Sequence, residues 1–228
     1  MRYAVIGAME IEVRSLAAEI ASPMREEISG VTFISGKIGD TDVIAAQCGA
    51  GKVNAALCAQ SMILRYTPDF VINIGVAGGL DPALEAGGVL LADAVVQYDL
   101  DTTAFGDPPG LIPRVGLVHI PCSADLNERL LALEPGLRLG SVASGDRFLT
   151  SAEEGARIAG EFGAAAVDME SGSIGHVCYV NQVPFAVLRA ISDKADGSAP
   201  GDFGDNLDRA ALRPIELLLK LLRTGVFF

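Results

Sequence analysis

The segment "VLRAISDKAD", from Val187 to Asp196, begins as an apolar strand and ends in charged residues. An arginine, Arg189, lies inside the apolar run, and Ser192 and Asp193 come where the strand should leave the sheet. In an open α/β sheet, ligands bind beyond the carboxyl ends of the strands. The segment therefore indicates a buried strand of an α/β sheet that carries polar groups to a site at its exit.

The rest of the chain alternates strand and helix patterns in the same way, which predicts one α/β domain over residues 1–228 with a mixed, mostly parallel sheet. After the first strand, apolar residues at 13, 16, 17 and 20 have helical spacing, and Ser151 has the position of an N-cap. Strands are expected at 3–8, 31–48 (a hairpin turning at Gly39-Asp40), 70–80 (ending in a glycine loop), 87–100, 137–149 (running into a loop) and 183–192, and helices at 49–66, 151–162, 164–182 (after a short strand) and 206–223 (with a kink at Pro214).

Composition excludes several classes of partner. Half of the 228 residues are apolar, which is enough for a large core, and the net charge of −12 disfavours nucleic acid and anionic membranes as partners. No apolar run has the length of a membrane span, and the N-terminus does not resemble a signal peptide. The four cysteines are far apart without a C-x-x-C motif, so we expect buried free thiols in a cytoplasmic protein.

Of five strand exits, four carry carboxylates, "GAMEIE", "SGDRFL", "VDME" and "RAISD", and the fifth is "GVAGG". Like charges in one place repel, so this pattern favours a site that binds hydroxyls and donates a proton. Simpler explanations exist for each residue. The helix dipole favours acids at helix starts, which would explain Glu10, Glu12 and Glu170. Asp193 could be an N-cap, and Arg189 could pair with a structural acid. "GAGK" at 49–52 lacks the spacing of a phosphate-binding loop, so Lys52 is expected to face solvent or a helix end.

The motifs, in this order and spacing, resemble the 5′-methylthioadenosine/S-adenosylhomocysteine nucleosidase family. The similarity spans nearly the whole chain, and it implies a three-layer fold with a central mixed sheet flanked by helices, like that of nucleoside phosphorylases and hydrolases. It also implies a homodimer that uses no cofactor and no metal. The motifs are "IGAMEIEV" (6–13), "GAGKVNAA" (49–56), "NIGVAGG" (73–79), "YDLDTTAFG" (98–106), "SGDRF" (144–148), "VDME" (167–170) and "RAISDKAD" (189–196).

The resemblance implies roles for three of the acids. Asp193 would protonate adenine N7, and Glu12 would orient or deprotonate the attacking water in an environment that Arg189 helps to set. Glu170 would hold the ribose 2′- and 3′-hydroxyls. The other implied substrate contacts are Met169 (sugar), Phe148 and Leu149 (adenine), Phe203 (5′-substituent), Phe105 and Pro113 (both lent by the partner subunit), and Met9, Ala77, Gly78 and Ser192.

The attacking group is expected to be water. Glu10 and Glu12 follow the first strand and would repel phosphate, which a phosphorylase must bind with cations. The resemblance therefore implies an N-glycosyl hydrolase that releases adenine from 5′-thio-substituted adenosines, as in methionine salvage. Three alternatives stay open: cleavage of aminofutalosine, a menaquinone precursor; a phosphorylase on the same fold; and a nucleoside sensor without turnover. Val76 departs from the family, where many members have serine.

Overall fold

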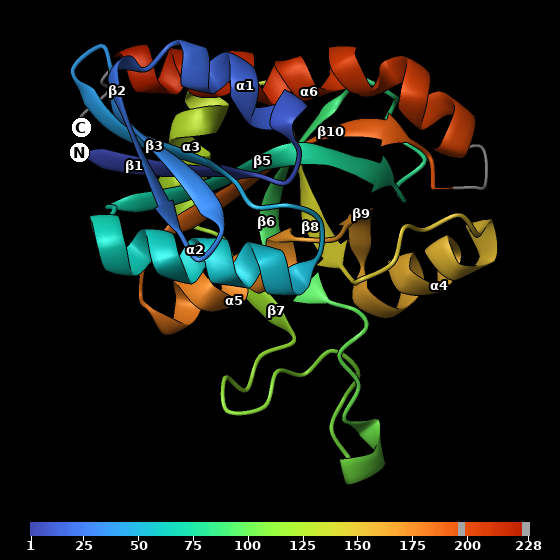
Figure 1. Cartoon of the computed structure of the whole chain (residues 1–228). Coiled ribbons are helices and arrows are strands. Elements are labelled where there is room, and N and C mark those ends of the chain that lie inside the picture. Colours follow the sequence, from blue (N-terminus) through green and yellow to red (C-terminus); the bar gives the residue numbers. More distant parts are fainter. Residues whose placement is uncertain (196–198, 225–228) are drawn as a thin grey trace.

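The structure is a computed structural model that describes residues 1–195 and 199–224; of residues 199–210 only the helical backbone is described. Helices pack on both sides of one sheet (Figure 1). The strands are β1 (Arg2–Gly7), β2 (Ala21–Ile28), β3 (Val31–Ile38), β4 (Thr41–Gln47), β5 (Phe70–Gly79), β6 (Val89–Gln97), β7 (His119–Pro121), β8 (Arg138–Ser144), β9 (Ala164–Asp168) and β10 (Phe185–Asp193), and the helices are α1 (Glu10–Ala18), α2 (Lys52–Tyr66), the 3-10 turn η1 (Thr103–Phe105), α3 (Ala124–Leu133), α4 (Ala152–Phe162), α5 (Ser171–Val180) and α6 (Ala199–Thr224).

The sheet is mixed, as expected, but it is not mostly parallel. The described strands make five parallel pairings and five antiparallel ones. Strands β5, β10, β6, β8 and β9 each pair with two others of this group, so this half of the sheet closes on itself. Closure brings the ends of strands that are distant in sequence into one ring, which a linear strand order does not reveal.

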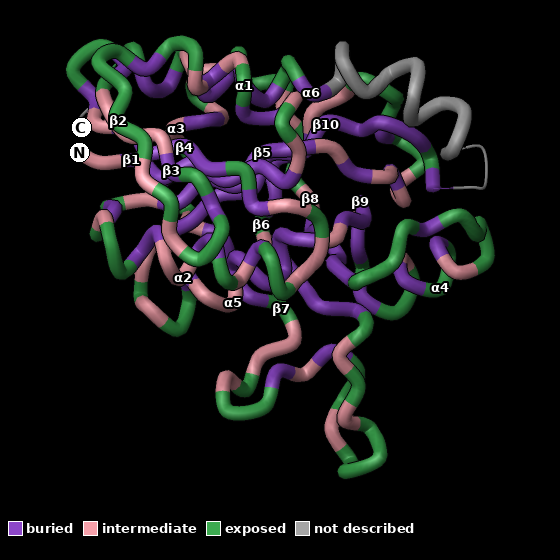
Figure 2. The backbone as a smooth tube through the Cα atoms, viewed as in Figure 1, coloured by how far each residue is buried: buried purple, intermediate pink, exposed green. Residues whose placement is uncertain are grey.

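Two apolar layers follow from the alternation of side chains along the strands. On β1, Ala4 and Ile6 face the layer formed with α2 and α5, whereas Tyr3 and Val5 face the layer formed with α1, α3 and α6. Successive side chains of a strand point to opposite faces, so a strand covered on both faces is apolar throughout. Figure 2 shows the buried strands between partly exposed helices.

Most expected elements are present, and the differences are local. The hairpin β3–β4, the N-cap at Ser151, which accepts from the Glu154 N–H at 3.3 Å, and the four buried free cysteines are confirmed. The prediction of a glycine loop near residue 79 was wrong, because β5 continues through Gly79 and pairs there with β9. Three further elements were not predicted: β2, β7 and α3, although α3 has an N-cap serine, Ser123, before its buried Leu126 and Leu130.

The C-terminal helix α6 begins at Ala199, earlier than expected, and Pro214 lies inside it. No helix among the described residues has an apolar stretch long enough to cross a bilayer.

Candidate active site

The five predicted strand exits meet around one cavity of about 170 Å³. The closed half of the sheet explains this convergence, since β5, β8, β9 and β10 belong to it and β1 pairs with β5. The cavity is mainly apolar with a few carboxylates, which is the usual character of a small-molecule site. Its wall consists of Ala8, Met9, Glu12, Ala50, Val76, Ala77, Gly78, Arg147, Phe148, Leu149, Val167, Asp168, Met169, Glu170, Ser192, Asp193 and Ala195.

Glu12 is held by three main-chain N–H groups. It is the third residue of α1 and reaches back over the helix start, where its Oε2 accepts from the N–H of Ala8 at 2.7 Å and of Met9 at 2.9 Å. Its Oε1 accepts from the N–H of Val76 at 3.1 Å. The carboxylate therefore fulfils the capping role that its helix position suggests and also points into the cavity. The Val76 contact comes from the main chain, so it does not require the serine that many family members have at this position.

Burial raises the pKa of Glu12, while the nearby Arg189 and the three N–H groups oppose this rise. A base whose pKa lies closer to neutrality is better matched to accepting a proton from water. Strand β5, which supplies the Val76 N–H, must leave room for the Glu12 carboxylate. A Cβ atom at Gly75 would lie 2.7 Å from Glu12 Oε1, so the glycine is required by close approach.

A β-bulge at the end of β10 sets the direction of Ser192 and Asp193. The pairing with β5 passes from Ile191–Ala77 to Asp193–Gly78, so one residue is extra on β10. In a regular strand these two neighbours would point to opposite faces, but both line the cavity. Asp193 Oδ2 accepts from the Ser192 hydroxyl at 2.7 Å and Oδ1 from the Ala195 N–H at 2.8 Å.

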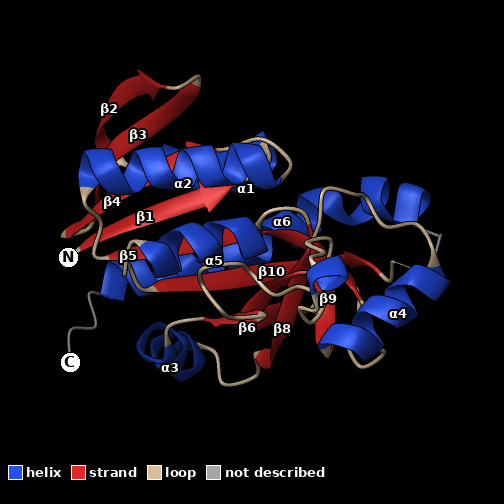
Figure 3. Cartoon of the chain, turned by 90° about the horizontal axis from the view of Figure 1, so that it is seen from below, coloured by secondary structure: helices blue, strands red, loops and turns tan. Residues whose placement is uncertain are grey.

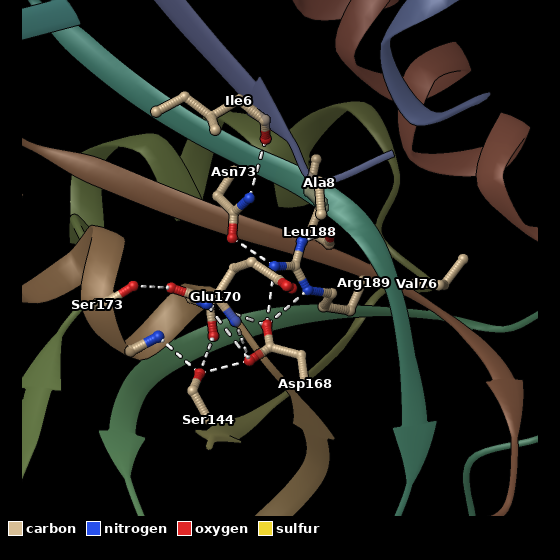
Figure 4. A network of polar contacts seen from close by, with 12 residues as sticks. Ile6, Ala8, Asn73, Val76, Ser144, Asp168, Glu170, Ser173, Leu188 and Arg189 are labelled. Carbon is tan, nitrogen blue, oxygen red and sulfur yellow. Dashed lines mark hydrogen bonds and ion pairs between the residues drawn. The ribbon is translucent and has the colours of Figure 1, made fainter. Parts of the chain in front are cut away.

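Arg189 belongs to a polar network beneath the cavity (Figure 4). It is 1% exposed, and its Nε donates to Asp168 Oδ2 at 2.8 Å. It also donates to Asn73, whose side-chain amide reaches the carbonyl of Ile6 at 2.9 Å. Arg189 thus pairs with a structural acid, which is the simpler of the explanations considered for it. Its side chain lies behind the residues that line the cavity and is not one of them. A buried arginine needs such a partner because an unpaired buried charge is costly.

Glu170 lies at the start of α5 and is 7% exposed. Its Oε1 accepts from the Gly51 N–H at 2.9 Å. Burial, together with the charge of Asp168, raises the pKa of Glu170 to about 7, although Arg189 and the Gly51 N–H oppose the rise. Two buried carboxylates, those of Asp168 and Glu170, thus line the same cavity, and the Arg189 guanidinium lies behind them. A carboxylate oxygen has two lone pairs, so Glu170 can accept further hydrogen bonds besides the one from Gly51.

The other predicted site residues divide into three groups. Met9, Ala77, Gly78, Phe148, Leu149, Met169 and Ser192 line the cavity. Phe105 is 88% exposed on the arm formed by residues 98–118, which extends away from the body in Figure 1, and Pro113 of the same arm is also exposed. Phe203 lies outside the described residues, as do the side chains of 199–210.

Sequence reasoning placed Asp168 among the acids at the strand exits without assigning it a role, and it did not single out Asn73. Asp168 is the last residue of β9 and accepts from the hydroxyl of Ser144 and, at 3.3 Å, from the Ser171 N–H. Asn73 could have been noticed as a polar residue inside an apolar strand, whereas nothing in the sequence indicates its pairing with Arg189. Within the described residues, no three His, Cys, Asp or Glu side chains form a group suited to a metal ion.

Comparison with known proteins adds the following. The Phosphorylase superfamily profile matches residues 2–223. A 5′-methylthioadenosine/S-adenosylhomocysteine nucleosidase of Staphylococcus epidermidis is 37% identical over 224 residues, 96% of this chain and 98% of the relative. A nucleosidase of the same name from Colwellia psychrerythraea, solved with adenine, has a TM-score of 0.92 at 34% identity over 97% of this chain and 94% of its own. Futalosine hydrolase of Helicobacter pylori has a TM-score of 0.94 at 33% identity over 99% and 98%.

Proposed function

Because the chain belongs to the 5′-methylthioadenosine/S-adenosylhomocysteine nucleosidases of the phosphorylase superfamily, which are N-glycosyl hydrolases, we propose that its cavity binds those two nucleosides and that water releases their adenine. The observation that carries the proposal is the convergence of Glu12, Glu170 and Asp193 on one largely apolar cavity. Three carboxylates in three different surroundings suit three different tasks in glycosidic cleavage.

Asp193 protonates N7 of the leaving adenine. The ribose becomes an oxocarbenium-like cation as the bond breaks, so the barrier falls when the purine leaves as a neutral base. The bulge at the end of β10 aims this carboxyl into the cavity, and its hydrogen bonds to Ser192 and Ala195 fix its orientation. A rigid strand end places an acid more accurately than a loop would.

Glu12 orients the water and takes its proton, with Arg189 contributing charge from beneath. Phosphate is disfavoured as the attacking group because the dianion would meet carboxylates. Among the described residues that line the cavity, the one basic side chain is Arg147, which is paired with Glu154 at 2.7 Å. Glu170 binds the ribose hydroxyls, Met169 contacts the sugar, and Phe148 and Leu149 contact the adenine.

A homodimer completes the 5′ end of the site. Apolar side chains are exposed on α2 and α5, which lie side by side in Figure 3, and on the arm 98–118. Exposed apolar surface of this kind favours a partner, and the arm would lend Phe105 and Pro113 to the neighbouring subunit. Phe203 would line the same pocket. The buried free cysteines suit the reducing cytoplasm, and the products suit methionine salvage.

Aminofutalosine is the second candidate substrate, because the similarity to a futalosine hydrolase is as extensive as that to the nucleosidases. Aminofutalosine has the same adenine and ribose as the thio-nucleosides, and these are the groups proposed to contact the cavity wall. Only the residues that bind the 5′-substituent would therefore distinguish between the substrates.

The test is a panel of methylthioadenosine, adenosylhomocysteine, 5′-deoxyadenosine and aminofutalosine, with and without phosphate, in which free adenine is measured. Adenine release in phosphate-free buffer is expected, fastest with the two thio-nucleosides. Release that depends wholly on phosphate would assign a phosphorylase, and tight nucleoside binding without turnover would assign a sensor.

A further inference from the structure

A cluster of charged groups outside the cavity holds the turn that leads into α2. Lys52 Nζ lies 2.5 Å from Asp99 Oδ1 and 3.3 Å from Gln97 Oε1. The main-chain N–H of Lys52 donates to Asp146 Oδ1 at 2.7 Å, and the N–H of Asp146 donates to Asp99 Oδ2 at 2.9 Å. The Lys52 side chain is only 15% exposed. Of the two places expected for it, solvent and a helix end, solvent was therefore wrong, and Lys52 is the first residue of α2. The cluster joins the start of α2 to the exits of β6 and β8.

The peptide next to this cluster reaches the site. Gly51 precedes Lys52, and its N–H is the group that donates to Glu170 Oε1 at 2.9 Å. Its φ of +96° is one that side chains rarely adopt, and a Cβ atom there would lie 3.1 Å from Asp146 Oδ1. The two peptide groups that flank Gly51 are therefore both held: the N–H of the Gly51–Lys52 peptide donates to Asp146, whose own N–H donates to Asp99, and the N–H of the Ala50–Gly51 peptide donates to Glu170.

We propose that Lys52, paired with Asp99, is a positioning residue that fixes the 49–52 turn so that the Gly51 N–H stabilises the ionised carboxylate of Glu170. This inference rests on the proposed function only where it assigns the ribose hydroxyls to Glu170. An ionised carboxylate is the better acceptor for two hydroxyl groups, since it carries no proton of its own. Asp99 also lies at the base of the arm 98–118, so the same pair connects the arm to the sugar end of the cavity.

The other charges near Glu170 come from separate elements. Asp168 on β9 and Glu12 on α1 raise its pKa, whereas Arg189 on β10 and the Gly51 N–H lower it. The Cys48 thiol at the exit of β4 also lies within electrostatic range, and burial keeps it neutral by raising its pKa. Glu12, Asp168 and Arg189 are held by hydrogen bonds that do not involve Lys52. Loss of the Lys52 side chain should therefore change the pKa of Glu170 through the hydrogen bond from the Gly51 N–H.

The experiment is a titration of the Glu170 carboxyl carbon by NMR in protein with ¹³C-labelled glutamate, without substrate, with the signal assigned through Glu170→Gln. In Lys52→Met, the pKa of Glu170 should rise by about one, the scale of one lost N–H donor to a carboxylate. Lys52→Arg retains the charge and donors and should titrate like the wild type. Lys37→Met is the control for loss of a paired lysine, because Lys37 forms a 3.0 Å ion pair with Asp42 that is more exposed and lies away from the cavity.

Kinetics give a second measurement. The acidic limb of the kcat/KM profile should move to higher pH in Lys52→Met by the same amount as the NMR titration, and Asp99→Asn should move it in the same direction. An unchanged Glu170 titration in folded Lys52→Met and Asp99→Asn would overturn the proposal, as would a Lys52→Arg variant that behaves like Lys52→Met. Absence of adenine release from every substrate would refute the proposed function alone, since the titration requires no turnover.

Discussion

Replacing Glu12 with glutamine separates its catalytic role from its capping role. Both oxygens of the carboxylate accept main-chain hydrogen bonds, two at Oε2 and one at Oε1. Glutamine has a single acceptor oxygen, which should face Ala8 and Met9 because two bonds are kept there. Its NH₂ group then faces the N–H of Val76, and one hydrogen bond is lost.

The expected effects on stability and on rate differ in size. An unpaired buried donor costs about 1–3 kcal/mol. Removal of a buried charge offsets part of this cost, because burial already disfavours the ionised form of Glu12. A net change of about 1 kcal/mol would move Tm by about 2–4 °C in a chain of this size. Loss of a general base lowers kcat by about 10²–10⁴, or roughly 3–5 kcal/mol in the barrier.

The assay follows adenine release from methylthioadenosine under single-turnover conditions, with Tm and adenine binding measured on the same samples. Glu10→Gln is the matched control, since Glu10 lies on the same first turn but is exposed and pairs with Arg14 only at 4.0 Å. It should retain wild-type kcat. A folded Glu12→Gln protein with kcat within tenfold of wild type would refute the assignment of the base.

Three further outcomes are expected. Asp193→Asn should lower kcat by about 10² or more while adenine still binds, and near-normal turnover would contradict the role of the acid. Glu170→Gln should stabilise the unliganded protein at pH 8 but not near pH 4: the raised pKa of about 7 means that the folded state holds this proton more tightly, so the free energy of unfolding falls as pH rises from about 4.5 to about 7. The raised pKa of Glu170 corresponds to at most about 3 kcal/mol in the free energy of unfolding. Urea unfolding of the wild type and of Glu170→Gln at both pH values measures this contribution. A stability difference between the two proteins that is the same at pH 8 and pH 4 would contradict the raised pKa. Phe105→Ala should weaken the preference for methylthioadenosine over adenosine and weaken dimerisation, measured by kcat/KM and sedimentation; a wild-type protein that sediments as a monomer would remove the lent-residue model.

Local patterns in the chain were sufficient for most of the secondary structure. Apolar residues at helical or strand spacing report which faces are buried, because burial follows the period of each element. The same reasoning identified the five strand exits, all of which contribute to the cavity wall. Weakly patterned segments were missed: β2 is an edge strand whose residues are mostly exposed, so its sequence has little apolar alternation.

What the sequence by itself determined is the set of buried strands and the acids that follow them, with an arginine inside an apolar run as the sign of a buried charge. Only the tertiary structure decided the partner of Arg189, the bulge that turns both Ser192 and Asp193 into the cavity, and the N–H groups that hold Glu12 and Glu170. The physical reason is that burial patterns are local, whereas strand register and buried polar pairing depend on contacts between distant segments. Val76 is 64 residues from Glu12, and Gly51 is 119 residues from Glu170.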